Sequence, residues 1–120
     1  MEKTDAYFSC DVGFNTFLAN SALSGPYEGL YFSGNSSCNV NMVQTDGGPV
    51  KIKDDVFFVV EMGCELSNPT KIRGMSATIY DAKCSGEGEH WDWRIILMKS
   101  YNGIYLIQDE FAAELIRCPE

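Results

Sequence analysis

The sequence has few basic residues and no long apolar run, and each of these features argues against certain classes of protein. Its 9 lysines and arginines are set against 17 acidic residues, which gives a formal net charge of −8. Binding to nucleic acid or to an anionic membrane surface needs a basic patch, so this composition argues against both. A membrane-spanning helix needs about 18 consecutive apolar residues, and no such run occurs.

Closely spaced cysteine pairs are also missing, although the chain contains five cysteines at Cys10, Cys38, Cys64, Cys84 and Cys118. Zinc sites and thioredoxin-like redox sites use pairs of the CxxC type, so neither is predicted. Widely spaced cysteines are typical of long-range disulfides in a small exported domain. Residues 1–10 lack the apolar region of a signal peptide, so periplasmic or secreted localisation requires a leader removed beforehand. The alternative is a cytoplasmic protein with buried, reduced thiols.

The chain of 120 residues has 45% hydrophobic and 12% aromatic residues, enough to build the core of a single domain over residues 1–120. Residues 1–29 form an irregular N-terminal segment, which we expect to pack on a β-domain over residues 30–118. Within this segment Phe14, Phe17, Leu18 and Ala22 recur at helical spacing, which predicts a short helix.

From residue 30 onward, short runs of β-forming residues alternate with polar turns. Residues 50–66 predict one long strand, because its even positions from Val56 to Leu66 are apolar; Phe58 is expected at the centre of the buried face. A second strand is predicted over residues 38–44, and residues 111–118 suit either a strand or a short helix. The sequence therefore predicts a mainly all-β fold. We expect an antiparallel meander of six to seven strands, forming a small barrel or a two-layer sandwich, with a short N-terminal helix.

The meander also predicts which cysteines pair. Residues that face each other across a hairpin have numbers with a constant sum. With a loop at residues 67–75 and no bulge, Cys38 and Cys84 fall at one end of the sheet. Cys64 and Cys118 then fall at the other end. We therefore expect the disulfides Cys38–Cys84 and Cys64–Cys118, with Cys10 unpaired.

The segment 81–94 has the highest density of chemically active side chains, with four carboxylates, the only histidine and both tryptophans. Its acidic residues surround a glycine-rich turn, as calcium ligands do, but Lys83 occupies a ligand position and no flanking helices are predicted. No metal site and no cofactor are therefore predicted. His90 and Asp92 could form a catalytic pair, yet no nucleophile motif accompanies them, so no catalytic residue is assigned.

Two interpretations of Trp91 and Trp93 stay open. They alternate with Ile95 and Leu97, which is typical of a buried strand face, but they could also line a ligand site. We expect a non-enzymatic exported binding or inhibitor module that recognises a protein or small ligand and is a monomer or weak homodimer. The alternatives are a small hydrolase using His90 and Asp92, and a cytosolic immunity-like or regulatory protein. The candidate binding residues are Glu87, Glu89, His90, Trp91, Asp92 and Trp93.

Overall fold

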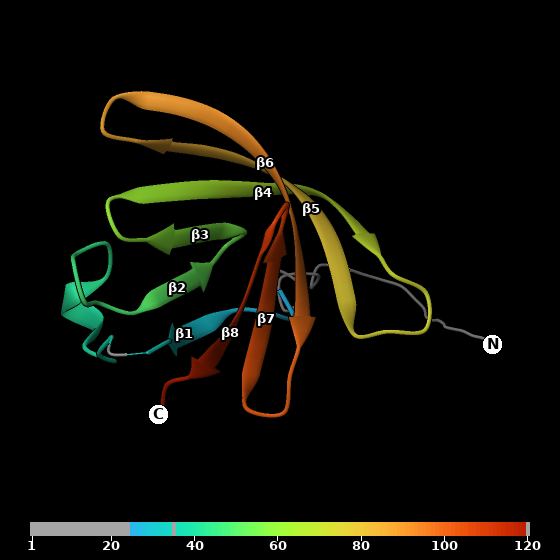
Figure 1. Cartoon of the computed structure of the whole chain (residues 1–120), viewed down its shortest axis with the longest axis horizontal. Helices are drawn as coiled ribbons and strands as arrows, with labels where there is room; N and C mark the ends of the chain where they lie inside the picture. Colours follow the sequence, from blue (N-terminus) through green and yellow to red (C-terminus); the bar gives the residue numbers. More distant parts are fainter. Residues whose placement is uncertain (1–24, 35, 120) are drawn as a thin grey trace, which may run out of the picture.

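The computed structural model describes residues 25–34 and 36–119, which form a closed antiparallel barrel of eight strands connected in chain order (Figure 1). All neighbouring strands pair antiparallel, and β1 closes the barrel by pairing with β8. The strands are β1 (Gly29–Phe32), β2 (Val50–Lys53), β3 (Val56–Val59), β4 (Met62–Lys71), β5 (Ala77–Gly86), β6 (Glu89–Lys99), β7 (Gly103–Gln108) and β8 (Phe111–Arg117). The predicted all-β class and antiparallel order are confirmed, and of the two expected architectures the barrel is found.

The expected six to seven strands are too few, because the predicted long strand over residues 50–66 is three strands. Two tight turns, Asp54-Asp55 and Val60-Glu61, separate β2, β3 and β4. Asp54 and Asp55 both have positive φ values, 55° and 63°, as in the hairpin turns that match the twist of the strands. Glycine, asparagine and aspartate dominate such turns, so Asp54-Asp55 is a turn signal that the run of apolar even positions obscured.

This division reverses the buried face of β3. Phe57 lies opposite Ile52 on β2 and opposite Cys64 on β4, and all three are buried. Directly opposed residues share one face of a sheet, so Phe57 points into the barrel and Phe58 points out. The expectation that Phe58 lies at the centre of the core was therefore wrong, whereas Cys64 and Leu66 on β4 do face inward as predicted.

Two further predicted elements are a strand over residues 38–44 and a short N-terminal helix. The expected strand over residues 38–44 is instead a loop that contains the 3-10 helix η2 (Val40–Met42). This is the sole helical element of the part of the chain that the structure describes. The expected helix near Phe14 and the cysteine Cys10 lie outside the described residues. The segment 111–118, which suited a strand or a helix, forms strand β8.

The disulfides are Cys38–Cys118 and Cys64–Cys84, so the predicted pairs Cys38–Cys84 and Cys64–Cys118 were wrong. The predicted loop over residues 67–75 was placed too early, because β4 continues to Lys71 through a register shift between Ser67 and Thr70. The longer strand brings Cys64 directly opposite Cys84, in the core. Cys38 lies in the loop after β1, which returns it to the end of β8 next to Cys118.

Three tyrosines close the end of the barrel where β1 begins. Tyr31 is fully buried, and its hydroxyl donates to the Tyr27 carbonyl oxygen at 2.6 Å and accepts from Arg117 Nη2 at 3.0 Å. The ring of Tyr27 packs edge-on against Tyr80, and its hydroxyl lies 2.9 Å from Oγ1 of Thr78. Burial raises the pKa of Tyr80 to about 12, with smaller contributions from Tyr27 and Asp55. This end is therefore sealed by hydrogen-bonded aromatic side chains.

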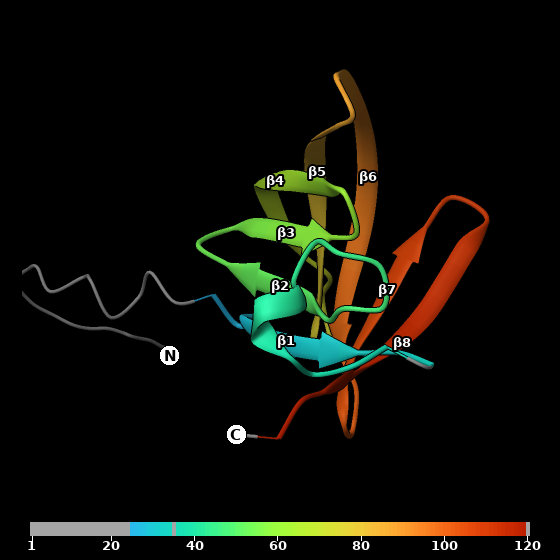
Figure 2. The ribbon, with the colours of Figure 1, turned by 90° about the vertical axis from the view of Figure 1, so that its left-hand side faces the viewer.

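The opposite end of the barrel is splayed open. β7 pairs with β6 only along Ile96–Lys99, so residues 89–95 of β6 have no partner on the β7 side. β1 likewise pairs with β8 only at Ile116 and Arg117. Figure 2 shows the β5–β6 hairpin rising away from the β7–β8 hairpin at this end. Two edges without a strand partner therefore border the mouth, namely residues 89–95 of β6 and the part of β8 before Ile116.

Candidate functional site

The splayed end contains an open apolar cavity of about 300 Å³. Inward-facing side chains from six strands line it; the principal ones are Val50, Phe57, Met62, Trp93, Leu106 and Phe111. A ligand cavity needs such an apolar lining with few polar groups, and the mouth of a small β-barrel is a common place for one. Phe111 is 52% exposed and Trp93 is 36% exposed at its rim. Large aromatic side chains exposed around a cavity are typical of a binding surface.

The two tryptophans lie on the inner face of β6, beside one another. Trp91 is opposite Cys84 and Trp93 is opposite Ala82, and both partners are buried. The indole rings contact edge to face, with centroids 5.7 Å apart. Trp91 packs against the core, whereas Trp93 is partly exposed because β7 does not extend far enough to cover it. Trp91 thus fits the core interpretation, whereas the ligand-site interpretation of Trp93 stays a prediction.

One polar atom of this pair has no partner. The indole N–H of Trp91 is buried, and among the described residues it has no hydrogen-bond acceptor. Most buried donors in folded proteins are paired, so an unpaired one calls for an explanation. Trp91 lies at the border between the inner face and the outer hollow described next.

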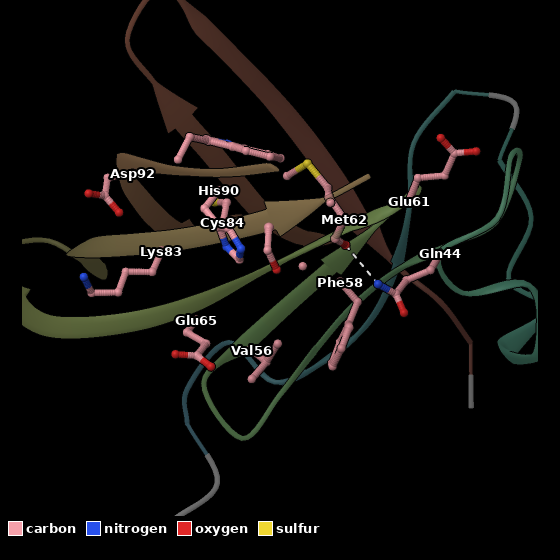
Figure 3. A pocket seen from close by; sticks show the side chains of 14 residues that line it. Gln44, Val56, Phe58, Glu61, Met62, Glu65, Lys83, Cys84, His90 and Asp92 are labelled. Atoms are coloured by element: carbon pink, nitrogen blue, oxygen red, sulfur yellow. Dashed lines mark hydrogen bonds between the residues drawn. The ribbon is translucent and has the colours of Figure 1, made fainter. Parts of the chain in front are cut away.

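His90 and Asp92 point to the opposite face of β6, away from the tryptophans. They border a hollow of about 690 Å³ on the outer surface of β3–β6 (Figure 3). In the sheet register His90 lies opposite Ser85, and Asp92 lies opposite Lys83. No hydrogen bond or ion pair joins His90, Ser85 and Asp92 in the part of the chain that the structure describes. The outer surface is thus a ladder of charged and polar side chains around the hollow.

Acidic side chains gather at the β3–β4 and β5–β6 turns. Glu61 and Glu87 both have positive φ values and occupy neighbouring turns at the splayed end. A hydrogen bond with the Glu87 carboxyl, followed by the charge of Glu87, raises the pKa of Glu61. Glu89 is exposed beside them at the start of β6.

Arg94, the basic residue on the outer face of β6, is already bound within the sheet. Its guanidinium contacts Asp81 Oδ1 through Nε and Nη2, each at 3.1 Å. Asn68 donates a hydrogen bond of 2.7 Å to the other carboxylate oxygen. The Asn68 hydrogen bond and the Arg94 contacts lower the pKa of Asp81. Asp81 therefore largely neutralises Arg94, and the surface potential near the mouth is set by the acidic turns.

The six candidate residues lie on one hairpin, but they divide between three surfaces. Trp91 and Trp93 belong to the inner face, His90 and Asp92 to the outer face, and Glu87 and Glu89 to the turn. The sequence did not indicate that the cavity is also lined by Phe57, Leu106 and Phe111. Their alternation could indicate a buried face, but not that the neighbouring strands would stop short and leave that face open.

Among the described residues no group of three or more histidine, cysteine or acidic side chains is arranged to hold a metal ion. None of the helices in the described part of the chain is long and apolar enough to span a membrane. No protein-family model, curated protein or solved structure matches the chain.

Proposed function

We propose that the protein is a non-enzymatic exported binding module whose ligand site is the splayed mouth of the barrel. The observation that carries the proposal is the apolar cavity with Trp93 and Phe111 exposed at its rim. Leaving these aromatic side chains in water is unfavourable by about 25 cal/mol per Å² of apolar surface, so a ligand that covers them gains that free energy. The strands pair into a closed barrel, which supplies a scaffold for the site.

The disulfides support the exported part of the proposal. Two disulfides, Cys38–Cys118 and Cys64–Cys84, involve four of the five cysteines. Structural disulfides persist in oxidising compartments and are rare in the cytosol of most organisms. Two disulfides thus favour a periplasmic or secreted protein over the cytosolic alternative.

The hydrolase alternative draws on one feature, the position of Ser85 opposite His90 with Asp92 two residues further on. A nucleophile–base–carboxylate system needs its members within hydrogen-bond reach of one another, and it usually lies in a cleft. All three side chains are exposed, and no hydrogen bond links them in the described structure. The binding module is therefore the function that we favour.

Titration with Nile red, a neutral apolar fluorophore, tests the ligand site. We expect the dye to bind with a blue-shifted emission and to quench tryptophan fluorescence, because Trp93 borders the cavity. Phe111→Ser should weaken this binding. Tyr101→Ser is the matched control, because Tyr101 is 99% exposed in the turn at the opposite end of β6. Equal affinities for both variants would contradict the proposal.

A further inference from the structure

The strand β6 has an unpaired edge along the mouth, and the register shows which backbone groups point from it. In an antiparallel sheet the N–H and C=O of one residue point to one side, and those of the next residue point to the other. The Lys99 N–H donates to Ser76 beside β5, while the Ser100 N–H donates to Gly103 beside β7. Odd-numbered residues of β6 therefore bond to β5, and even-numbered residues point to the β7 side.

The register between β5 and β6 is uninterrupted from Ala77 to Gly86, so the same alternation holds along the whole strand. β7 reaches only to Ile96, and the backbone groups of His90, Asp92 and Arg94 thus face an edge where no described strand pairs with them. Such an edge can take a further strand, and natural proteins usually blunt it with proline, lysine or a bulge. Residues 89–95, EHWDWRI, contain no proline, lysine or bulge, and their charged residues are Glu89, Asp92 and Arg94.

A strand added to this edge would also fill the mouth. Seven residues, 89–95, span on the order of 20 Å. Side chains opposite Trp91 and Trp93 would lie on the inner face of the sheet, where Trp93 borders the apolar cavity, and those between them would point outward beside His90 and Asp92. The ligand that matches this edge is an extended peptide with apolar residues at alternate positions.

The acidic side chains near both ends of this edge indicate which residues the peptide carries at its own ends. One end of the edge adjoins the β5–β6 turn, where Glu87 and Glu89 are exposed, and the other adjoins the β7–β8 turn, where Asp109 and Glu110 are exposed. These four carboxylates favour a partner with lysine or arginine at both ends of the paired segment. A second copy of this chain is disfavoured as the partner. Pairing of two β6 edges would place the acidic side chains of its β5–β6 turn beside the acidic side chains of the first copy.

We propose that the edge of β6 binds an extended segment of a partner protein by β-strand addition, with alternating apolar side chains entering the mouth and basic residues at both ends. This inference rests on the proposed binding function and adds the chemical class of the ligand. Recognition then combines backbone hydrogen bonds, apolar side-chain contacts and electrostatic attraction at the two turns.

The test uses a nine-residue synthetic peptide with lysine at both ends and valine alternating with threonine between them. We expect binding to the full chain, detected by tryptophan fluorescence, that weakens as the salt concentration rises. A peptide with glutamate in place of both terminal lysines should bind more weakly than the lysine peptide at the same salt concentration. Methylating the backbone nitrogens that face β6 should abolish it, because charge and apolar surface are kept while the hydrogen bonds are lost.

A matched pair of variants at one position isolates the edge itself. Asp92→Pro removes an N–H that points away from β5, so the β5–β6 pairing is kept, and Asp92→Ala removes the carboxylate but keeps the N–H. We expect Asp92→Pro to bind the peptide at least about tenfold more weakly than Asp92→Ala, since one lost hydrogen bond and the adjoining ring weaken pairing. Unchanged melting temperatures confirm that both variants fold.

Four results would overturn the inference. Equal binding of the methylated peptide, or equal binding by Asp92→Pro and Asp92→Ala, would show that no strand is added. Failure of every peptide to bind, with Nile red binding intact, would exclude the peptide ligand and leave the apolar site standing. A homodimer seen by sedimentation that dissociates in Asp92→Pro would show that a second copy occupies the edge.

Discussion

Phe57 and Phe58 are adjacent in sequence and have opposite environments. Phe57 is 3% exposed between Ile52 and Cys64, whereas Phe58 borders the outer hollow. The alternation that the sequence shows on even positions holds in β4, but the two-residue turn at Val60-Glu61 reverses it in β3. The length of this turn thus decides which aromatic ring enters the core.

Truncation of these two rings tests the reversal. We expect Phe57→Ala to lower the free energy of unfolding by about 3 to 5 kcal/mol, because it leaves a cavity in the core. Phe58→Ala should lower it by only about 1 kcal/mol, since that ring is partly solvated. Urea denaturation of both variants provides the measurement. A larger loss for Phe58→Ala would mean that the register of β3 is wrong.

The Glu61–Glu87 contact makes the splayed end sensitive to pH. The folded pKa of Glu61 is raised above its unfolded value, chiefly by the hydrogen bond with Glu87. The stabilisation is therefore fully present below the unfolded pKa of about 4.3 and is lost as the pH rises through the folded pKa. Ionisation of Glu61 is opposed by the nearby charge of Glu87, so the folded state is less favoured at higher pH.

We accordingly expect Glu61→Gln to raise the melting temperature at pH 7 and to leave it unchanged at pH 4. Calorimetry at the two pH values provides the comparison. Glu114→Gln on β8 is the matched control, since it removes one charge far along the chain from these turns. An equal rise for both variants at pH 7 would attribute the effect to net charge alone.

At the scale of elements, the β4–β5 hairpin determines the disulfide pattern. Its strands continue through Asn68 and Pro69, residues that the sequence assigned to a loop, with a register shift that accommodates them. A proline is tolerated here because β3 does not extend alongside this part of β4. The hairpin is consequently longer than expected, and its register differs from that of the simple loop.

The two disulfides should contribute unequally to stability. In the chain-entropy model the 80-residue separation of Cys38–Cys118 corresponds to about 4.5 kcal/mol, and the 20-residue separation of Cys64–Cys84 to about 3.3 kcal/mol. Replacing each pair by alanine and measuring denaturation with urea tests the order. Peptide mapping of the non-reduced protein tests the connectivity, and a Cys38–Cys84 peptide would contradict the structure.

At the scale of the whole molecule, the barrel is sealed at one end and open at the other. The sealed end uses buried tyrosines tied by hydrogen bonds, and the open end exposes aromatic rings beneath acidic turns. This asymmetry concentrates exposed apolar surface and unpaired backbone at a single place. It is the physical basis for assigning binding to that end.

The exported interpretation also concerns the molecule as a whole. With two disulfides formed, four of the five cysteines have no free thiol. We expect thiol titration of the native-source protein, in denaturant and without reductant, to find at most one reactive thiol per chain. Addition of reductant should then expose five. Five thiols before reduction would support the cytosolic alternative.

The sequence by itself determined the all-β class, the antiparallel order and several turns, because period-two alternation and residues such as Glu87-Gly88 act locally. It also located the hairpin of Trp91 and Trp93. Only the tertiary structure decided the disulfide pairs, the face of Phe57 and the open mouth. Each of these depends on where strands far apart in the chain begin and end, and a shift of one or two residues in register changes which side chains meet.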